Sequence, residues 1–256
     1  MKNNSALDKE IIKNNFSRGS INYDALALMQ KNVARKLVGL AKNFISGDKN
    51  ILDLGSGTGF VAQEILKINE DVKIIETDLS SEMLSKWQRP KNVSAIVCDI
   101  ENLLFIDEKF DMIFSSFALH WINDFEKSFE KFSNLLARGG IIAFCIPSAS
   151  SLDELAVDDV FLVNKFPQIS AIENLLEKNN LQKIYCEKEI YIEEFFDIIA
   201  AAKYIKKIGG NYNSQKNNPP ASRLAQLRNF YLKNLSNDNR KFQLSWHNAF
   251  FLYQKK

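Results

Sequence analysis

The stretch Ile51-Leu52-Asp53-Leu54-Gly55-Ser56-Gly57-Thr58-Gly59-Phe60 decides the fold of this 256-residue chain. A short apolar run meets a carboxylate and continues through three glycines at alternate positions, after which apolar residues recur at helical spacing. This pattern predicts a buried strand, a tight turn and the start of a helix. Glycine permits positive φ and lets a ligand approach the backbone closely, because it has no Cβ. A ligand-binding loop over residues 55–59 is therefore expected, with an ordinary glycine-containing turn as the alternative.

The spacing of these glycines excludes two common nucleotide motifs. The dinucleotide fingerprint G-x-G-x-x-G needs its third glycine one residue later, where this chain has Phe60, and no lysine follows as in the phosphate-binding loop. The acid-x-G-x-G-x-G arrangement instead resembles the first motif of the class I S-adenosylmethionine (SAM) methyltransferases. In that family the loop passes beneath the methionine part of the cofactor. The resemblance implies that SAM is bound by Asp53, Gly55, Gly57 and Gly59.

Composition excludes several other classes of protein. The chain is 46% hydrophobic and 25% charged, as in ordinary globular domains, and 33 basic against 31 acidic residues give a net charge of +2. That balance is too even for wholesale nucleic-acid binding. Cys98, Cys145 and Cys186 are widely spaced, and the chain has two histidines, which disfavours a Cys/His zinc site. We therefore expect neither a nucleic-acid partner nor a metal.

Nothing in the sequence predicts export or membrane insertion. The first residues carry no apolar signal core, and no run approaches the roughly 18 apolar residues of a membrane span. A cytoplasmic protein without a membrane partner is expected.

A second candidate site follows the next apolar run, Val72 to Thr77. Asp78 lies about 20 residues beyond the glycines, where a second-strand carboxylate can bond a ribose diol. The D-x-S-x-x-M-L run that starts at Asp78 resembles the second methyltransferase motif, and the resemblance adds Leu79 to the cofactor-binding residues. Glu76, two residues earlier, could compete for the ribose role.

Further candidates follow the third and fourth predicted strands. Strand Val93 to Val97 leads to Asp99 and Ile100; in the family such an acid meets the adenine amino group and the next apolar side chain lies against the ring. Strand Phe110 to Phe114 leads to Ser116, a further cofactor-binding candidate, and to His120-Trp121. Ligands bind at this end of α/β sheets. The His-Trp pair either packs in the core or forms the lip of the active site.

Together these elements predict an α/β fold, a Rossmann-like seven-stranded SAM methyltransferase sheet whose last strand is antiparallel. We expect one domain over 1–256. Its parts are an N-terminal helical lid (1–46), the SAM-binding core (47–192), a helical cap insertion (193–238) and the final strand (239–256). Within them the predictions include a helix ended by Gly139-Gly140, a fifth strand over 140–146, a sixth over 183–192, and helices over 194–208 and 222–235.

The flanks resemble one subfamily, the malonyl-acyl-carrier protein (ACP) O-methyltransferases of biotin synthesis. The matching segments are Phe16-Ser17-Arg18-x-x-x-x-Tyr23 with Met29-Gln30, Ala118-Leu119-His120-Trp121, Ile205-Lys206-Lys207-Ile208-Gly209 and Leu244-Ser245-Trp246-His247. The chain departs from the family at Ser56, often Cys there, and at Ser245-Trp246, usually Thr-Tyr.

The resemblance implies a monomeric enzyme that methylates the free carboxylate of malonyl-ACP to its methyl ester, at the start of pimeloyl and biotin synthesis, and releases S-adenosyl-L-homocysteine. Such an acceptor suits the residues present. Methyl transfer from a sulfonium is an in-line displacement, so alignment supplies much of the rate. A carboxylate with a pKa of about 4 is already ionised near neutral pH and needs no general base.

For the acceptor, we expect Tyr23, His120 and Lys206 to hold the malonyl carboxylate, with Arg18 as the alternative cation. Lys203, Lys206, Lys207, Arg223 and Arg228 either face an acidic carrier protein or form a solvated helix face. Two other functions stay open. One is methylation of another small acid or a quinone precursor; the other is a non-catalytic or hydroxylating relative that serves as an assembly factor.

Overall fold

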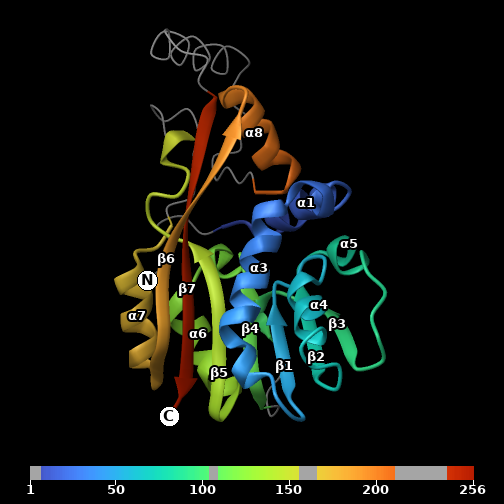
Figure 1. The fold of residues 1–256 in the computed structure, drawn as a ribbon, viewed down its shortest axis with the longest axis vertical. Coiled ribbons are helices and arrows are strands. Elements are labelled where there is room, and N and C mark those ends of the chain that lie inside the picture. The colour runs from blue at the N-terminus through green and yellow to red at the C-terminus, as the bar shows by residue number, and fades with distance from the viewer. Residues whose placement is uncertain (1–6, 104–108, 156–165, 211–240) are drawn as a thin grey trace.

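A single sheet runs through the middle of the computed structural model, which describes residues 7–103, 109–155, 166–210 and 241–256 (Figure 1). Helices cover both faces of the sheet, so the predicted α/β fold is confirmed. Its strands are β1 Asn50–Leu54, β2 Lys73–Asp78, β3 Val93–Val97, β4 Phe110–Ser116, β5 Leu136–Pro147, β6 Leu181–Phe195 and β7 Phe242–Lys255. They lie in the order β3-β2-β1-β4-β5-β7-β6. The pairs among β1 to β5 are parallel, and β7 is antiparallel to β5 and β6.

The alternating side chains of β1 divide the core into two layers. Ile51 faces the layer that contains α3 and α4, whereas Leu52 and Leu54 face the layer that contains α6 and α7. All three side chains are fully buried, as expected for a central parallel strand covered on both faces.

The described helices are α1 Lys9–Gly19, α2 Tyr23–Leu26, α3 Leu28–Ala41, α4 Phe60–Leu66, α5 Ser81–Leu84, α6 Phe125–Leu135, α7 Ile169–Lys178 and α8 Ile198–Lys207, with 3₁₀ turns η1 Lys42–Phe44, η2 Ile100–Asn102, η3 Leu119–Trp121 and η4 Asp153–Leu155.

The predicted helix cap at Gly139-Gly140 is wrong. α6 ends at Leu135 and the chain enters β5 at Leu136. Phe110 pairs with Leu136 and Met112 pairs with Ile141, so the intervening residues of β5 bulge out of the ladder. Gly139 supplies the left-handed conformation of this bulge, with φ +76°. Pairing with β4 therefore overrides the local helix-ending pattern.

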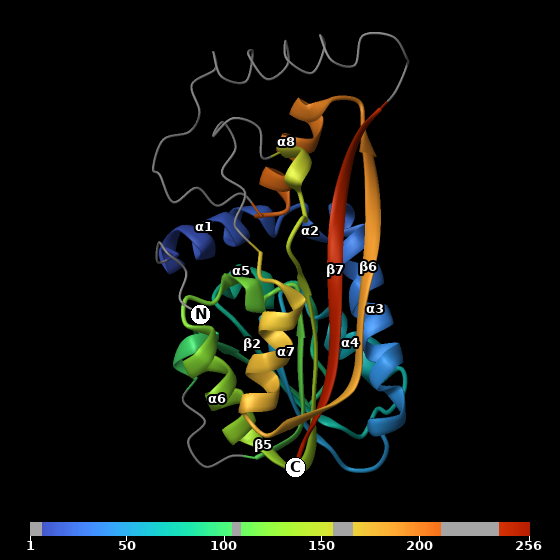
Figure 2. The ribbon, with the colours of Figure 1, turned by 90° about the vertical axis from the view of Figure 1, so that its left-hand side faces the viewer.

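The last two strands extend beyond the rest of the sheet as a two-stranded antiparallel arm, which we define as residues 190–195 and 242–247. β7 pairs with β5 only as far as Asn248, so the strand ladder of the arm is β6–β7 pairing, and the backbone N–H groups of Ser148 and Leu152 also donate to its His247 and Ser245 carbonyls (both 2.8 Å). In Figure 2 the arm rises past the other strands and carries α8 at its tip. α8 begins at Ile198 and not at 194, because Glu194 and Phe195 still pair with β7.

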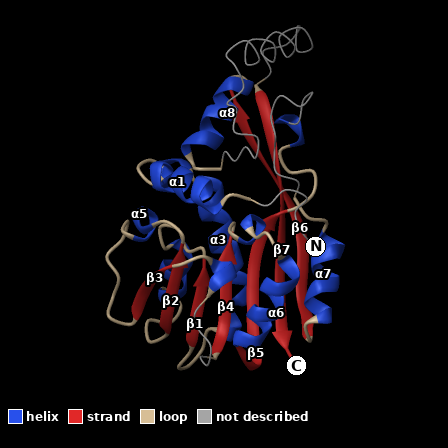
Figure 3. Ribbon diagram, turned by 180° about the vertical axis from the view of Figure 1, so that it is seen from behind, coloured by secondary structure: helices blue, strands red, loops and turns tan. Residues whose placement is uncertain are grey.

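The helices before β1 have two different positions. α3 packs on the sheet against β4 and β5, whereas α1 lies above the carboxyl ends of the strands and contacts α5 and α8 (Figure 3). α3 is thus a core helix, and α1 and α2 are the part of the predicted lid that covers the sheet edge. The predicted helix over 222–235, Arg223, Arg228 and most of the predicted cap lie outside the described residues. No helix in the described ranges has both the length and the apolar character needed to cross a membrane.

Candidate active site

The glycine turn after β1 forms the floor of a cavity under α1 and α2. Gly55, Gly57 and Gly59 have φ of +69°, +57° and +82°, in the region that favours glycine. A Cβ on Gly55 would overlap the Ala118 side chain, and one on Gly59 would overlap the Trp87 ring. The turn therefore needs glycine at these positions both for its conformation and for close packing.

Asp78 at the end of β2 holds the glycine turn from one side. Its carboxylate accepts hydrogen bonds from the backbone N–H groups of Gly57 (2.9 Å) and Ser80 (2.8 Å) and lines the cavity. Burial raises the pKa of Asp78 to about 6, although the hydrogen bonds from backbone N–H groups act against this rise. The competing carboxylate, Glu76, is fully buried in an ion pair with Arg89 and accepts a hydrogen bond from Trp87 Nε1 (3.2 Å). Asp78 is thus the β2 carboxylate that faces the cavity.

Asp53, two residues before the glycines, is fully buried, and neither of its carboxylate oxygens has a hydrogen-bond partner among the described residues. Burial, with the charges of Glu76 and Asp78, raises its pKa well above the usual range. A buried carboxylate without a partner is costly unless a cation or a donor meets it. This site therefore fits a ligand that brings an ammonium group to the glycine turn and hydroxyl groups to Asp78, as SAM does.

The structure brings many, but not all, of the predicted site residues to this cavity. Those that line it are Tyr23, Gly55, Gly57, Asp78, Leu79, Ile100 and Ser116. Gly59 lies in the same turn, against Trp87, and Asp53 lies buried at the start of the turn. Sequence reasoning missed Lys9 and Gln30 as site residues, although both line the cavity.

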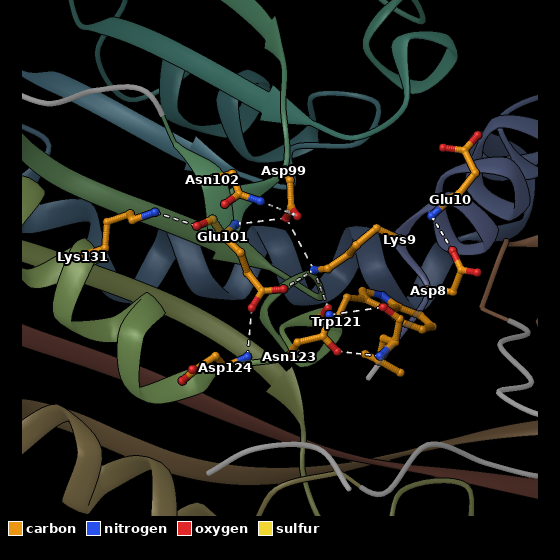
Figure 4. A network of polar contacts seen from close by, with 11 residues as sticks. Asp8, Lys9, Glu10, Asp99, Glu101, Asn102, Trp121, Asn123, Asp124 and Lys131 are labelled. Carbon is orange, nitrogen blue, oxygen red and sulfur yellow. Dashed lines mark hydrogen bonds and ion pairs between the residues drawn. The ribbon is translucent and has the colours of Figure 1, made fainter. Parts of the chain in front are cut away.

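Lys9 explains how α1 is fixed over the cavity (Figure 4). Its Nζ lies 2.6 Å from Glu101 and 3.4 Å from Asp99, and it donates to the Trp121 carbonyl at 2.9 Å. Asp99 also accepts from the Glu101 backbone N–H at 3.0 Å and from the Asn102 amide at 3.3 Å. The predicted adenine-binding carboxylate, Asp99, does not itself line the cavity; it is held by Lys9 of α1 next to Ile100, which does. Nothing local in the sequence marks Lys9, because its partners are about 90 or more positions away.

The lid helices also contact the first two cofactor loops. Asp24 of α2 accepts a hydrogen bond from Thr58 in the glycine turn (2.7 Å). Ser17 of α1 lies 2.9 Å from the Ser80 hydroxyl and donates to Glu82 (2.7 Å) after β2. Together with the Lys9 contacts, these bonds join α1 and α2 to the loops that follow β1, β2 and β3. Any movement of α1 and α2 away from the cavity would therefore break polar contacts with each of these loops.

His120 lies behind the cavity wall in an aromatic cluster. Its ring centroid is 4.9 Å from that of Trp121, 5.7 Å from Phe166 and 6.1 Å from Phe117. Burial lowers its pKa to about 3, and its Nδ1 is buried with no hydrogen-bond partner from residues 7–103, 109–155, 166–210 or 241–256. Phe117 and Trp121 of this cluster line the cavity, and Phe117 holds a left-handed φ of +57°, an uncommon conformation typical of constrained sites. His120 is thus a neutral side chain that supports the aromatic wall.

The structure does not bring Lys206 or Arg18 to the cavity. Lys206 is exposed on α8, whose buried face consists of Ile198, Ala201 and Ile205. Arg18 is exposed and donates to the Asn14 carbonyl (3.0 Å) and the Asn15 side chain (3.2 Å) of its own helix. The prediction that either cation lies beside Tyr23 and His120 does not match this geometry, because each helix turns the cation outward.

Comparisons with known proteins find similarity to methyltransferases. Residues 52–144 match the family described as a methyltransferase domain. Malonyl-acyl-carrier protein O-methyltransferase 1 of Ilyobacter polytropus is 34% identical over 88% of this chain and 82% of its own length. The second such enzyme of that organism is 30% identical over 89% and 91%. A solved Bacillus halodurans structure described as a methyltransferase has a TM-score of 0.65 and 17% identity, covering 88% of this chain and 99% of its own, a likeness of fold alone.

Proposed function

The chain belongs to the class I SAM-dependent methyltransferases, in the family of the malonyl-ACP O-methyltransferases, and from that premise we propose that it methylates the free carboxylate of a malonyl group on ACP. The observation that carries this proposal is the extent of the similarity. It covers 88% of the chain and so continues on both sides of residues 52–144. Those flanks supply α1 and α2, whose residues line the cavity, and α8, which contacts both of these helices. The product is the malonyl methyl ester, the first intermediate of pimeloyl and biotin synthesis.

We assign the cofactor contacts to residues of the four strand ends. The glycine turn and Asp53 would hold the methionine part of SAM, Asp78 its ribose hydroxyls, and Asp99 its adenine amino group. The apolar side chains of Leu79 and Ile100 would enclose the ring, and Ser116 lies at the end of β4 beside them. When bound, SAM supplies a methyl group on a sulfonium, which a nucleophile can displace. The demethylated product is S-adenosyl-L-homocysteine, and no metal has a part in this proposal.

The protein's part in the reaction is to orient the acceptor and exclude water. The cavity walls include Phe16, Phe117 and Trp121, and burial together with the Asp78 and Asp24 charges raises the pKa of Tyr23 far above neutrality. Tyr23 therefore remains a hydrogen-bond donor that can orient an oxygen of the acceptor. A carboxylate that has lost its water in such a site is a stronger nucleophile, and a fixed in-line geometry removes much of the entropic barrier. No side chain has to remove a proton from it.

The pH dependence of the rate should report this absence of a base. Because the pKa of His120 is lowered to about 3, we expect kcat at saturating substrates to stay flat between about pH 6 and 9. His120→Asn should lower kcat only a few-fold, through poorer packing of the aromatic wall, and leave the profile flat. Steady-state rates across this pH range test both statements. An inflection near pH 6.5 that disappears in His120→Asn would instead make His120 a titrating catalytic base.

The carrier protein, in this proposal, meets the exposed cations of α8. Lys203, Lys206 and Lys207 are exposed on a helix with no acidic residue, and the end of α1 that carries Arg18 packs against the end of α8. Lys206→Ala should raise KM for malonyl-ACP about two- to five-fold, increasingly at low salt, and leave SAM affinity unchanged, since rim charges act mainly on association. Lys42→Ala is the matched control, because Lys42 is an exposed lysine at the C-terminal end of α3 and not on α8. Unchanged kinetics in Lys206→Ala would remove Lys206 from the docking surface.

The proposed function is tested by transfer of a labelled methyl group from SAM. We expect the pure enzyme to methylate malonyl-ACP and to be far less active on free malonate or trans-aconitate, which lack the carrier. We also expect the gene to restore growth without biotin to a strain that lacks the methylation step. Transfer to a free acid but not to malonyl-ACP would favour the other small-acid methyltransferase function. SAM binding without methylation of any of these acids would favour an assembly-factor role.

A further inference from the structure

The described cavity leaves the acceptor carboxylate without an available cation. Among the described residues that line the cavity, Lys9 is the one with a positive charge. Its Nζ already contacts Glu101 (2.6 Å), Asp99 (3.4 Å) and the Trp121 carbonyl (2.9 Å). An ammonium group has three N–H donors, so these contacts account for the binding capacity of Lys9. Among the residues that the structure describes, the groups that can meet an acceptor carboxylate here are therefore neutral.

Gln30 is a neutral group of the cavity wall with unused hydrogen-bonding capacity, as is Ser56 in the glycine turn on the cofactor side. Gln30 lies in the first turn of α3, lines the cavity with Tyr23 and Ala34, and is only 8% exposed, and its Oε1 has no hydrogen-bond partner in the part of the chain that the structure describes. A buried amide oxygen without a partner costs about 1–3 kcal/mol. Gln30 also lies beside Tyr204, whose pKa is raised by burial and by the Glu193 carboxylate, with the Gln30 amide acting against them. A half-turn of the Gln30 amide would place its oxygen toward the Tyr204 hydroxyl and its NH₂ group toward the cavity.

We propose that Gln30 binds the acceptor: its amide N–H, together with the Tyr23 hydroxyl, donates to the acceptor carboxylate and selects a carboxylate over an uncharged acyl group. This inference rests on the proposed function. It also has an energetic reason. The negative charge of the acceptor disappears as the oxygen–methyl bond forms, so a lysine or arginine contact would stabilise the ground state more than the transition state. Neutral donors fix the same orientation of the carboxylate and stabilise its charged ground state less, so they raise the barrier to methyl transfer less.

Binding and kinetics of Gln30→Ala test the proposal. We expect KM for malonyl-ACP to rise about tenfold or more, because a buried hydrogen bond to a charged group is lost. We expect a larger rise in KM for malonyl-ACP in Gln30→Glu, because the glutamate carboxylate repels the acceptor carboxylate. SAM affinity by calorimetry should change less than about twofold in Gln30→Ala. In a direct binding assay with S-adenosylhomocysteine present, wild type should prefer malonyl-ACP to butyryl-ACP, and Gln30→Ala should lose that preference.

Asn32→Ala is the matched control, because Asn32 is an exposed amide on the same helix. The outcomes separate the two proposals. If wild type does not methylate malonyl-ACP, the proposed function fails. If wild type does so and Gln30→Ala keeps both its KM and its preference for malonyl-ACP, the role of Gln30 alone is excluded. An equal loss of SAM affinity in Gln30→Ala would make Gln30 a structural residue of the cavity and would also overturn the proposal.

Discussion

Asp78→Ala is expected to raise the Kd of SAM about 100-fold. The change removes a half-buried carboxylate that lines the cavity and also releases the backbone N–H groups of Gly57 and Ser80. Hydrogen bonds to a charged group contribute about 1.5–3 kcal/mol each, and about 1.4 kcal/mol corresponds to a tenfold change in affinity. Asp78→Asn keeps the shape of the side chain and one acceptor oxygen, so we expect the Kd of SAM to rise only about tenfold. Calorimetric titration with SAM and with S-adenosylhomocysteine measures both variants.

The pH dependence of this binding is a second readout. Because burial raises the pKa of Asp78 to about 6, the carboxylate takes up a proton in the free enzyme as the pH falls below that value. SAM affinity of the wild type should therefore fall between about pH 7 and 5, and Asp78→Asn should lack this dependence. Asp71→Asn, an exposed carboxylate that precedes the same strand, is the control for both measurements. Wild-type affinity in Asp78→Ala would contradict the assignment of the ribose site.

Local sequence predicted that the glycine turn and Asp78 come together, and both line the cavity. This prediction has a physical reason. The carboxylate, the three glycines and the following helix are contiguous, and positive φ at three positions is a strong local demand. The carboxyl ends of parallel strands must meet at one edge, so the residues after β2, β3 and β4 could be placed together before any contact was known. The α/β fold followed from the same strands. The hydrogen bond between Gly57 and Asp78 is what this reasoning requires.

The predictions that did not match concern contacts between distant segments. Lys9 has no local pattern that marks it, because the loops it meets come from other parts of the chain. Gln30 stands in the Met29-Gln30 segment of the family resemblance, but nothing in that segment indicates that its side chain faces the cavity. Lys206 is different, because the spacing of apolar residues in its helix already indicates that its side chain lies outside the buried face. Ile198, Ala201 and Ile205 recur at helical spacing and define the buried face of α8, and Lys206 follows the last of them, outside that face.

Arg89→Met is expected to cost roughly 3–5 kcal/mol of unfolding free energy. Arg89 pairs with Glu76, which is fully buried near Asp53 and Asp78, and donates to the Leu84 carbonyl at 2.6 Å. Removing one partner leaves an uncompensated buried charge, which is far costlier than losing an exposed pair. Lys67→Met is the matched control, because Lys67 pairs with Glu64 at 2.7 Å but is largely exposed; we expect less than about 0.5 kcal/mol there. Urea denaturation monitored by tryptophan fluorescence measures both.

The sign of the pH dependence distinguishes this mechanism from a simple packing defect. Burial raises the pKa of Glu76 above its usual value, and the Arg89 charge opposes that rise, so the variant's folded state holds the Glu76 proton to higher pH than wild type. Between the unfolded pKa of about 4.3 and the raised folded pKa, the folded state binds more protons, so stability falls as pH rises. The deficit of Arg89→Met should therefore shrink as the pH is lowered from 8 toward 5, and Glu76→Gln in the same chain should recover part of it. Trp87, which donates to Glu76 and packs against Gly59, connects this pair to the glycine turn. Weaker SAM binding should accompany the lost stability, whereas a deficit that stays constant with pH would show that lost packing, and not the buried charge, is the cause.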